Sequence, residues 1–268
     1  MAMSMYTYPS YGKGKRKIST VSMLHYVRLA YRSVLFILLL VSYIRFRIKS
    51  SNEMLSGLVA HPAILAVTWI VFAAEMLLRF FPSRYESPGC QKQFARNYIK
   101  SGNTDISIPD NNATLLVALI WIIFNCIFGA FHMLGILDDG IMLLLCGFYS
   151  VCDMICILFF CPFQSWLLKN KCCSSCRIYN WDYAMMFTPL FFVRRGYYWS
   201  LLALSVVLLL RWEITFFRHP ERFSEKTNEY LKCVNCTEKL CSHKKQLKTL
   251  WRHIERNAQE RLSRLRKP

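Results

Sequence analysis

Long apolar blocks separated by basic segments constrain this chain more than any other feature of its sequence. Within each block the apolar residues run continuously, which is typical of membrane helices and unlike the spacing of a soluble amphipathic helix. Hydrophobic residues make up 54% of the chain, more than ordinary soluble domains contain. We therefore expect an all-α, polytopic helical membrane protein with about six membrane segments. The expected segments are residues 21–48, 58–81, 115–137, 141–163, 181–193 and 197–217.

Residues 181–193 form the weakest of these blocks, because they number only 13 and include Pro189. A helix of this length reaches about 20 Å, whereas the hydrocarbon core of a bilayer is about 30 Å thick. We therefore expect a short, tilted or re-entrant segment that is buried among its neighbours.

The distribution of Lys and Arg favours a crossing at this short block. If residues 181–193 do not cross, the segments on the N-terminal side hold 15 Lys and Arg residues and the opposite ones hold 17. If they cross, the counts become 27 and 5, and the positive-inside rule prefers this arrangement. We expect an integral protein of a plasma (inner) membrane with both termini cytosolic. The five basic residues on the far side are Arg45, Arg47, Lys49, Arg194 and Arg195.

The formal net charge of +18 is carried mostly between the apolar blocks and in the two tails, where it would face anionic lipid head groups. Nucleic acid is the competing partner, but no nucleic-acid-binding motif accompanies the charge, so none is expected. Residues 1–20 are expected to be a basic disordered arm, and the first apolar block is interpreted as a retained helix because no cleavage site follows it. Residues 21–217 form the transmembrane domain, with a cytosolic cysteine loop at 161–182, and residues 218–268 form a cytosolic tail.

Two groups of cysteines suggest a metal site on the cytosolic face. Cys173 and Cys176 are separated by two residues, as are Cys233 and Cys236. This spacing lets a tight turn direct both thiolates at one centre, and two such pairs supply the four ligands of a zinc ion or an iron–sulfur cluster. Cytosolic thiols are kept reduced, which favours metal binding over disulfides. The reserve ligands are Cys161, Cys172, Cys241 and His243.

Other interpretations of these cysteines remain open. They include palmitoylation close to the membrane, a thiol redox pair and inert thiols. Cys126, Cys146, Cys152 and Cys156 lie inside apolar blocks and are expected to act as small hydrophobic residues.

The end of the fourth block is similar to a helix end in membrane ferredoxin-type proteins, which exchange electrons with quinone. In those proteins a Cys-Pro pair precedes the cytosolic iron–sulfur ligands, and the matching residues here are Cys161, Pro162 and the two cysteine pairs. The full four-cysteine ferredoxin run is missing. The resemblance implies an iron–sulfur centre that transfers electrons.

Ionisable residues inside the apolar blocks are functional candidates, because a charge in the bilayer core is costly. The main ones are Glu75, His132 and Asp153. A proton or ion path through Glu75 and Asp153 is one interpretation, and hydrogen bonding that fixes helix packing is the other. Glu75 and Arg79 have the spacing to pair within one helix. His132 and Asp153 are expected at different depths, out of contact.

Charged residues near the block ends are expected to reach the membrane surface. Arg28 and Arg32 would do so at the start of the first block and extend it, and Arg211 and Glu213 would do so at the end of the last block. The third and fourth blocks are expected to form a helical hairpin. Its small residues would allow close packing, and they are Gly129, Ala130 and Gly147.

The tail contains a basic amphipathic helix whose apolar stripe includes Leu247, Trp251 and Ile254. We expect this helix to lie on anionic lipid, with Trp251 at the interface. The alternative is association with a protein partner or with a second copy as a homodimer.

Three functions fit these features, and no Walker-type, Gly-x-Ser-x-Gly or His-Glu-x-x-His motif points to catalysis. The first is membrane electron transfer, or redox or metal sensing, at the cytosolic cysteine site. The second is a non-catalytic membrane subunit or scaffold with structural zinc. The third is a small proton- or ion-coupled transporter that uses Glu75 and Asp153.

Overall fold

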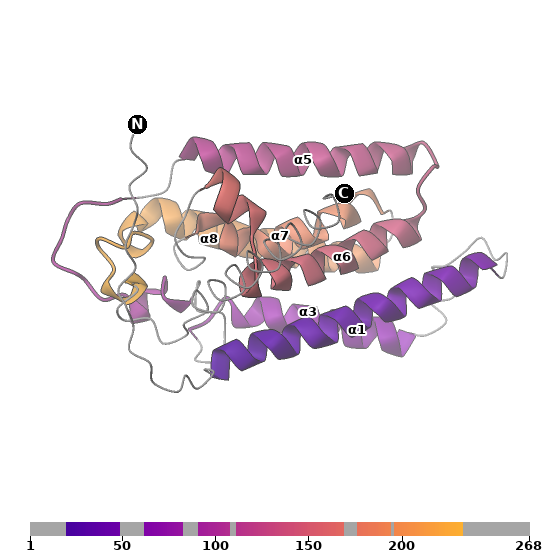
Figure 1. The fold of residues 1–268 in the computed structure, drawn as a ribbon, viewed down its shortest axis with the longest axis horizontal. Helices are drawn as coiled ribbons and strands as arrows, with labels where there is room; N and C mark the ends of the chain where they lie inside the picture. The colour runs from indigo at the N-terminus through magenta and orange to yellow at the C-terminus, as the bar shows by residue number, and fades with distance from the viewer. Residues whose placement is uncertain are drawn as a thin grey trace, which may run out of the picture.

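A computed structural model describes residues 20–48, 62–82, 91–107, 111–168, 176–193 and 196–232. These residues form a helical bundle (Figure 1), and no strand occurs among them apart from one isolated bridge between Lys100 and Asn228. The long helices are α1 (Thr20–Ile48), α3 (Pro62–Leu78), α5 (Asn111–Met133), α6 (Asp139–Leu158) and α8 (Gly196–Arg218). The short ones are η1 (Ala95–Asn97), the π-helical η2 (Phe163–Leu167), η4 (Arg177–Trp181), α7 (Asp182–Phe187), η5 (Thr188–Phe192), η6 (Pro220–Arg222) and η7 (Glu229–Leu231).

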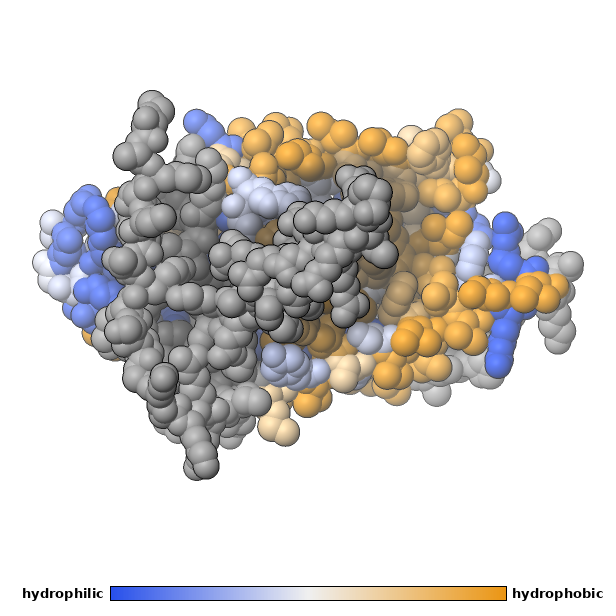
Figure 2. All heavy atoms as spheres, viewed as in Figure 1, coloured by the Kyte–Doolittle hydropathy of each residue, from blue (hydrophilic) through white to orange (hydrophobic). Residues whose placement is uncertain are grey.

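Four of the described helices are long and apolar enough to cross a membrane. Their apolar stretches are Met23–Arg45, Asn112–Met133, Asp139–Leu158 and Tyr198–Arg218, and Ala66–Leu78 is a shorter apolar helix. Figure 2 shows apolar side chains over the middle of the molecule and hydrophilic groups toward its two ends. An exposed apolar belt of this kind is what a membrane-embedded bundle presents to lipid. The expectation of an all-α protein with membrane-type helices is therefore confirmed.

Cross-helix contacts fix the relative directions of two pairs of long helices. In α1 and α6, Tyr26 packs on Phe159 whereas Tyr43 bonds Asp138, so these helices run antiparallel. In α3 and α8, Trp69 bonds Ser200 and Arg211 bonds the Phe80 carbonyl, so these two run parallel.

Helices α7 and η5 together form the short segment that the sequence predicted. Tyr183 contacts Glu75 and Phe187 packs on Phe72, so this segment runs antiparallel to α3. Phe192 lies against Gly129, near the opposite end of the bundle from Tyr183. The segment is largely buried, and its α-helix changes to a 3-10 helix at Thr188–Phe192, which begins next to Pro189. A proline lacks the N–H that a continued α-helix would need.

Three expected helix ends differ from the structure, and α3 ends at Leu78 instead of at residue 81. Helix α5 ends at Met133, four residues before the predicted end, because Gly135 takes φ 75° and Asp138 caps the next helix by accepting from the Ile141 N–H. Helix α6 ends at Leu158 instead of at residue 163, and Pro162 then begins the π-helical turn. Gly129 and Gly147 are closely packed, but not within the hairpin as predicted. A Cβ on Gly129 would lie 2.3 Å from the Phe192 ring of η5, and one on Gly147 would lie 3.1 Å from Phe36 of α1.

The start of α1 and the ends of α3, α6 and α8 gather at one end of the bundle, which we call the polar end (left in Figure 1). Residues 91–107 and 219–232 pack together there. Asn228 pairs with Lys100, and its side chain donates to the Lys92 carbonyl at 3.0 Å. Phe94 packs edge-on against Trp212, with ring centroids 5.1 Å apart. The segments that follow α3 and α8 therefore form one joint cap on the polar end.

Candidate functional site

Arg32 of α1 lies at the centre of a buried group of charges near the polar end. Its side chain has no solvent exposure. The guanidinium lies 2.7 Å from a carboxylate oxygen of Glu75 in α3 and 3.0 Å from one of Asp153 in α6. It also donates to the Ser150 carbonyl at 3.1 Å. One arginine thus links three helices.

Glu75 is held by several donors at once. Arg28 Nε lies 3.2 Å from Oε1, and the Tyr31 hydroxyl donates to the same oxygen. The Tyr183 hydroxyl, from α7, donates to Oε2 at 3.1 Å. Because each oxygen of this carboxylate accepts from two groups, its charge is well compensated although the residue is buried.

Arg79 and Asp182 form a second pair beside the first. Nη1 of Arg79 lies 2.6 Å from Oδ1 of Asp182, and both side chains are buried. The Arg79 guanidinium also lies over the Tyr183 ring, 4.6 Å from its centroid. Tyr183 therefore connects the two pairs, through its hydroxyl to Glu75 and through its ring to Arg79.

These residues balance in formal charge. Three arginines and three carboxylates meet, from α1, α3, α6 and the start of α7. Isolated charges would be very costly in this environment, whereas a paired, hydrogen-bonded and neutral group is tolerated. We call this set the charge cluster, and its members are Arg28, Arg32, Glu75, Arg79, Asp153 and Asp182.

The structure brings two of the three predicted intramembrane residues together. Glu75 and Asp153 both bind Arg32, whereas His132 lies at the other end of the bundle. There His132 bonds the Leu137 carbonyl at 2.9 Å and lies 3.3 Å from Asp139. His132 and Asp153 are thus at different depths, as expected.

Two details of the charge pattern differ from expectation. Arg32 does not extend to the membrane surface, because Glu75 and Asp153 hold its side chain inside the bundle. Arg79 bonds Asp182 across to α7, a partner that the spacing of Glu75 and Arg79 within one helix did not suggest.

Glu213 is also drawn into the protein, although it was expected to reach the membrane surface. It forms an ion pair with Arg177, and the indole N–H of Trp181 donates to it at 2.6 Å. Arg211, in contrast, is exposed as expected and donates to the Phe80 carbonyl at 3.2 Å.

Of the best four predicted metal ligands, the structure describes Cys176 alone. Cys176 is buried beside Val117, Met154 and Ile157. Cys161, a reserve ligand, accepts from the Gln164 N–H at 3.4 Å. The other candidates lie outside the described residues, as does the lipid-binding stripe: Cys172, Cys173, Cys233, Cys236, Cys241 and His243, with Leu247, Trp251 and Ile254. Within the described ranges, no group of three or more His, Cys, Asp or Glu residues is arranged to hold a metal.

Nevertheless, a described residue next to each predicted cysteine pair lies at the polar end. Arg177, which follows Cys176, pairs with Glu213 near the end of α8. Lys232, the residue before Cys233, belongs to the cap on the same end. The two cysteine-bearing segments therefore start from one end of the bundle.

Sequence reasoning missed Asp182, Tyr183 and Tyr31 as members of this site, and it gave Arg28 and Arg32 a surface role. One signal was present, because the apolar blocks and their edges contain carboxylates as well as arginines, namely Glu75, Asp153 and Asp182. Charges of opposite sign inside a bilayer favour mutual neutralisation over separate reach to the surface.

Comparison of the chain with protein-family models, with curated proteins and with solved structures gives no match.

Proposed function

We propose that this protein is a non-catalytic membrane scaffold or subunit, in which the charge cluster locks four of the membrane segments together, namely α1, α3, α6 and the α7–η5 segment. The single observation that carries the proposal is the set of bonds made by Arg32, which joins Glu75 in α3, Asp153 in α6 and Tyr183 in α7. A side chain with fixed partners on three elements resists separation of those elements. This is the behaviour expected of a structural lock.

The transporter alternative is less favoured by the same contacts. A proton- or ion-coupled transporter needs a carboxylate that changes its partner or its charge during the cycle. Glu75 and Asp153 are both paired with one buried arginine, and Glu75 has three further donors. Protonation of either carboxylate would leave the charge cluster with one uncompensated positive charge, and a broken buried pair costs about 3–5 kcal/mol.

In the proposed orientation the polar end faces the cytosol of a plasma (inner) membrane. The positive-inside count supports this choice, because the basic tails and the loop after α3 all leave the bundle at this end. The short α7–η5 segment would then complete an even number of crossings, and its burial among α3, α6 and α8 would compensate for its length.

Reconstituted protein distinguishes scaffold from transporter. Full-length protein in liposomes that enclose a pH-sensitive dye should show no proton flux above that of protein-free vesicles, under either sign of an imposed potential. Asp153→Asn protein should behave identically. A flux that the wild type supports and Asp153→Asn abolishes would replace the scaffold with a transporter.

A structural metal is a second candidate element of this scaffold, favoured by the common location of Cys176 and Lys232 at the polar end. Cys173, Cys176, Cys233 and Cys236 would hold zinc or an iron–sulfur cluster and tie the tail to the loop. Metal analysis of the purified protein tests this. One zinc per chain that is lost in Cys176→Ser protein and kept in Cys126→Ser protein supports structural zinc, and iron with visible absorption supports the electron-transfer alternative. Protein without metal refutes both.

A further inference from the structure

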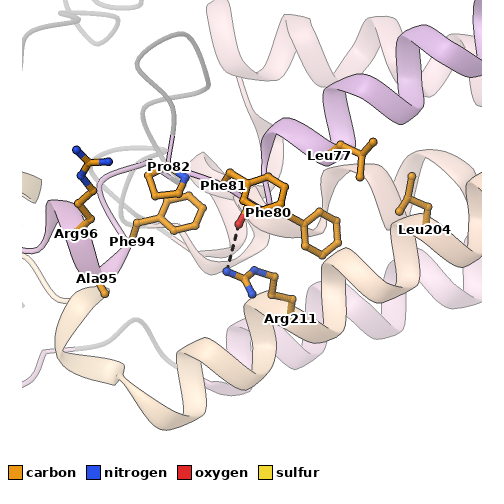
Figure 3. Close-up of a pocket in the computed structure, with 9 residues that line it drawn as sticks. All are labelled: Leu77, Phe80, Phe81, Pro82, Phe94, Ala95, Arg96, Leu204 and Arg211. Carbon is orange, nitrogen blue, oxygen red and sulfur yellow. Dashed lines mark hydrogen bonds between the residues drawn. The ribbon is translucent and has the colours of Figure 1, made fainter.

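An open groove of about 570 Å³ lies where α3 ends beside α8 (Figure 3). This volume is within the roughly 300–1,000 Å³ range of small-molecule sites. The groove has an apolar part, formed by Leu77, Phe80, Phe81 and Leu204, and two arginines, Arg96 and Arg211. It is separate from the charge cluster.

The polarity of the groove changes along the bundle axis. Leu204 precedes Arg211 by seven residues in α8, which places it about 10 Å deeper along the helix. Arg96 lies in η1, beyond the end of α3 and within the cap. In Figure 3 the two leucines lie at one end of the groove, Arg96 lies at the other, and Arg211 lies between them. A membrane lipid has the same order, with chains toward the bilayer centre and a charged head outside.

Both guanidinium groups are accessible. Arg211 is exposed and donates one hydrogen bond to the Phe80 carbonyl, 3.2 Å away, so most of its N–H groups remain available. Arg96 is also exposed, and it forms no hydrogen bond or ion pair with any other residue that the structure describes. The planar donors of arginine match the oxygens of a phosphate.

We propose that this groove binds one anionic phospholipid, with the phosphate facing Arg96 and Arg211 and an acyl chain against Leu77 and Leu204. This inference rests on the proposed membrane function, because a bilayer lipid can enter the groove only if the protein is embedded in the membrane and the groove faces the lipid. Charge complementarity favours an anionic lipid over a zwitterionic one. The exposed apolar rim at Leu77 and Phe81 favours an acyl chain as the second part of the ligand.

The test uses full-length protein in a neutral detergent, with phosphatidylglycerol as the probe. Native mass spectrometry should show one retained phosphatidylglycerol per chain, and its addition should raise the unfolding temperature in a saturable way. In the Arg96→Gln/Arg211→Gln variant the half-saturating lipid concentration should rise about tenfold or more, the effect expected for a lost charge-assisted hydrogen bond. Leu77→Trp should fill the groove and weaken binding without a change in charge.

A matched control removes two positive charges elsewhere. Arg45→Gln/Lys100→Gln protein should bind phosphatidylglycerol like the wild type, because both side chains are exposed and neither lines the groove. Phosphatidylcholine should bind more weakly than phosphatidylglycerol, and glycerol 3-phosphate should not compete at equal concentration. Equal competition by glycerol 3-phosphate, or equal binding by the Arg96→Gln/Arg211→Gln variant, would overturn the proposal.

Failure of the lipid site can be told apart from failure of the membrane function. Wild-type protein that leaves the membrane in an alkaline carbonate wash would refute the proposed function itself. Protein that stays in the membrane, yet binds phosphatidylglycerol equally with and without the two arginines, would refute the lipid site alone.

Discussion

Arg32 Nη2 lies 2.7 Å from Oε2 of Glu75, although the two residues are 43 positions apart and belong to different helices. The pair has almost no contact with solvent, since the exposed fractions of the two side chains are 0% and 9%. Around it are arranged the other members of the charge cluster. We therefore expect the stability of the bundle to be sensitive to substitution of this pair.

Arg32→Met should strongly destabilise the protein. Removal of the guanidinium leaves Glu75 and Asp153 partly uncompensated in a buried site, which costs about 3–5 kcal/mol. Arg47→Met in the same helix is the matched control, because Arg47 is 65% exposed and lies 4.0 Å from Asp138. An exposed pair of this kind contributes about 0–1 kcal/mol. Thermal unfolding in detergent measures both, and equal unfolding temperatures for the two variants would refute the central role of Arg32.

The quadruple variant Arg28→Met/Arg32→Met/Glu75→Gln/Asp153→Asn should recover much of the stability that Arg32→Met loses. It removes two positive and two negative charges that pair with one another. Replacement of a whole buried ion network is often close to neutral, because no uncompensated charge is left behind. A monodisperse, cooperatively unfolding quadruple variant would support a structural role. If the quadruple variant is less stable than Arg32→Met alone, the four groups are needed as charges and not only as a lock.

Arg79 and Asp182 should be energetically coupled. Arg79→Gln leaves the Asp182 carboxylate without the cation that lies 2.6 Å from it, and Asp182→Asn leaves Arg79 without that anion. We expect the double variant to lose less stability than the sum of the losses of the two single variants, with a coupling free energy of about 0.5–3 kcal/mol. A double-mutant cycle of unfolding in detergent gives this value. Strict additivity would show that the contact carries no energy.

Gly129→Ala should be less stable than Gly147→Ala. A Cβ at Gly129 would lie 2.3 Å from the Phe192 ring, whereas one at Gly147 would lie 3.1 Å from Phe36. Each change gains up to about 1 kcal/mol of helix propensity, but forced overpacking costs about 1–3 kcal/mol. Phe192→Leu should rescue Gly129→Ala and leave Gly147→Ala unaffected. The reverse order of stability would mean that the η5 segment does not pack on α5 as described.

Both chain ends should be protected from protease in sealed right-side-out vesicles. Epitope tags at the N and C termini report their sides separately, and the proposed even number of crossings puts both tags inside. A tag inserted after residue 195 should be cleaved from the outside, because Phe192 and Trp199, on either side of it in the chain, lie at the end away from the cap. Protection of only one terminal tag would show that residues 182–193 do not cross.

Part of the fold follows directly from local sequence pattern. Continuous apolar runs predicted the helices, and the spacing of turn residues predicted the α5–α6 hairpin, because these signals depend on neighbours within a few residues. The helix ends were less accurate. Gly135 ends α5 earlier than hydropathy alone indicated, and Asp138 caps α6 so that it begins earlier than indicated.

The membership of the charge cluster illustrates what could not be predicted. Glu75 and Asp153 were selected because a charge in an apolar block is costly wherever it lies. Their common partner Arg32 was assigned to the membrane surface, because the long side chain of a basic residue near the end of a block can usually reach water. Asp182 was not selected, since it lies at the edge of the short block.

The sequence by itself determined that this chain forms apolar helices, how many apolar segments it has and where its excess positive charge is carried. Those properties arise from each segment's own composition. Only the tertiary structure decided that Arg32 binds Glu75 and Asp153, that Arg79 turns to Asp182 and that residues 91–107 pair with residues 219–232. The physical reason is that such contacts depend on which helices are neighbours and at what relative depth, and packing of the whole bundle sets both.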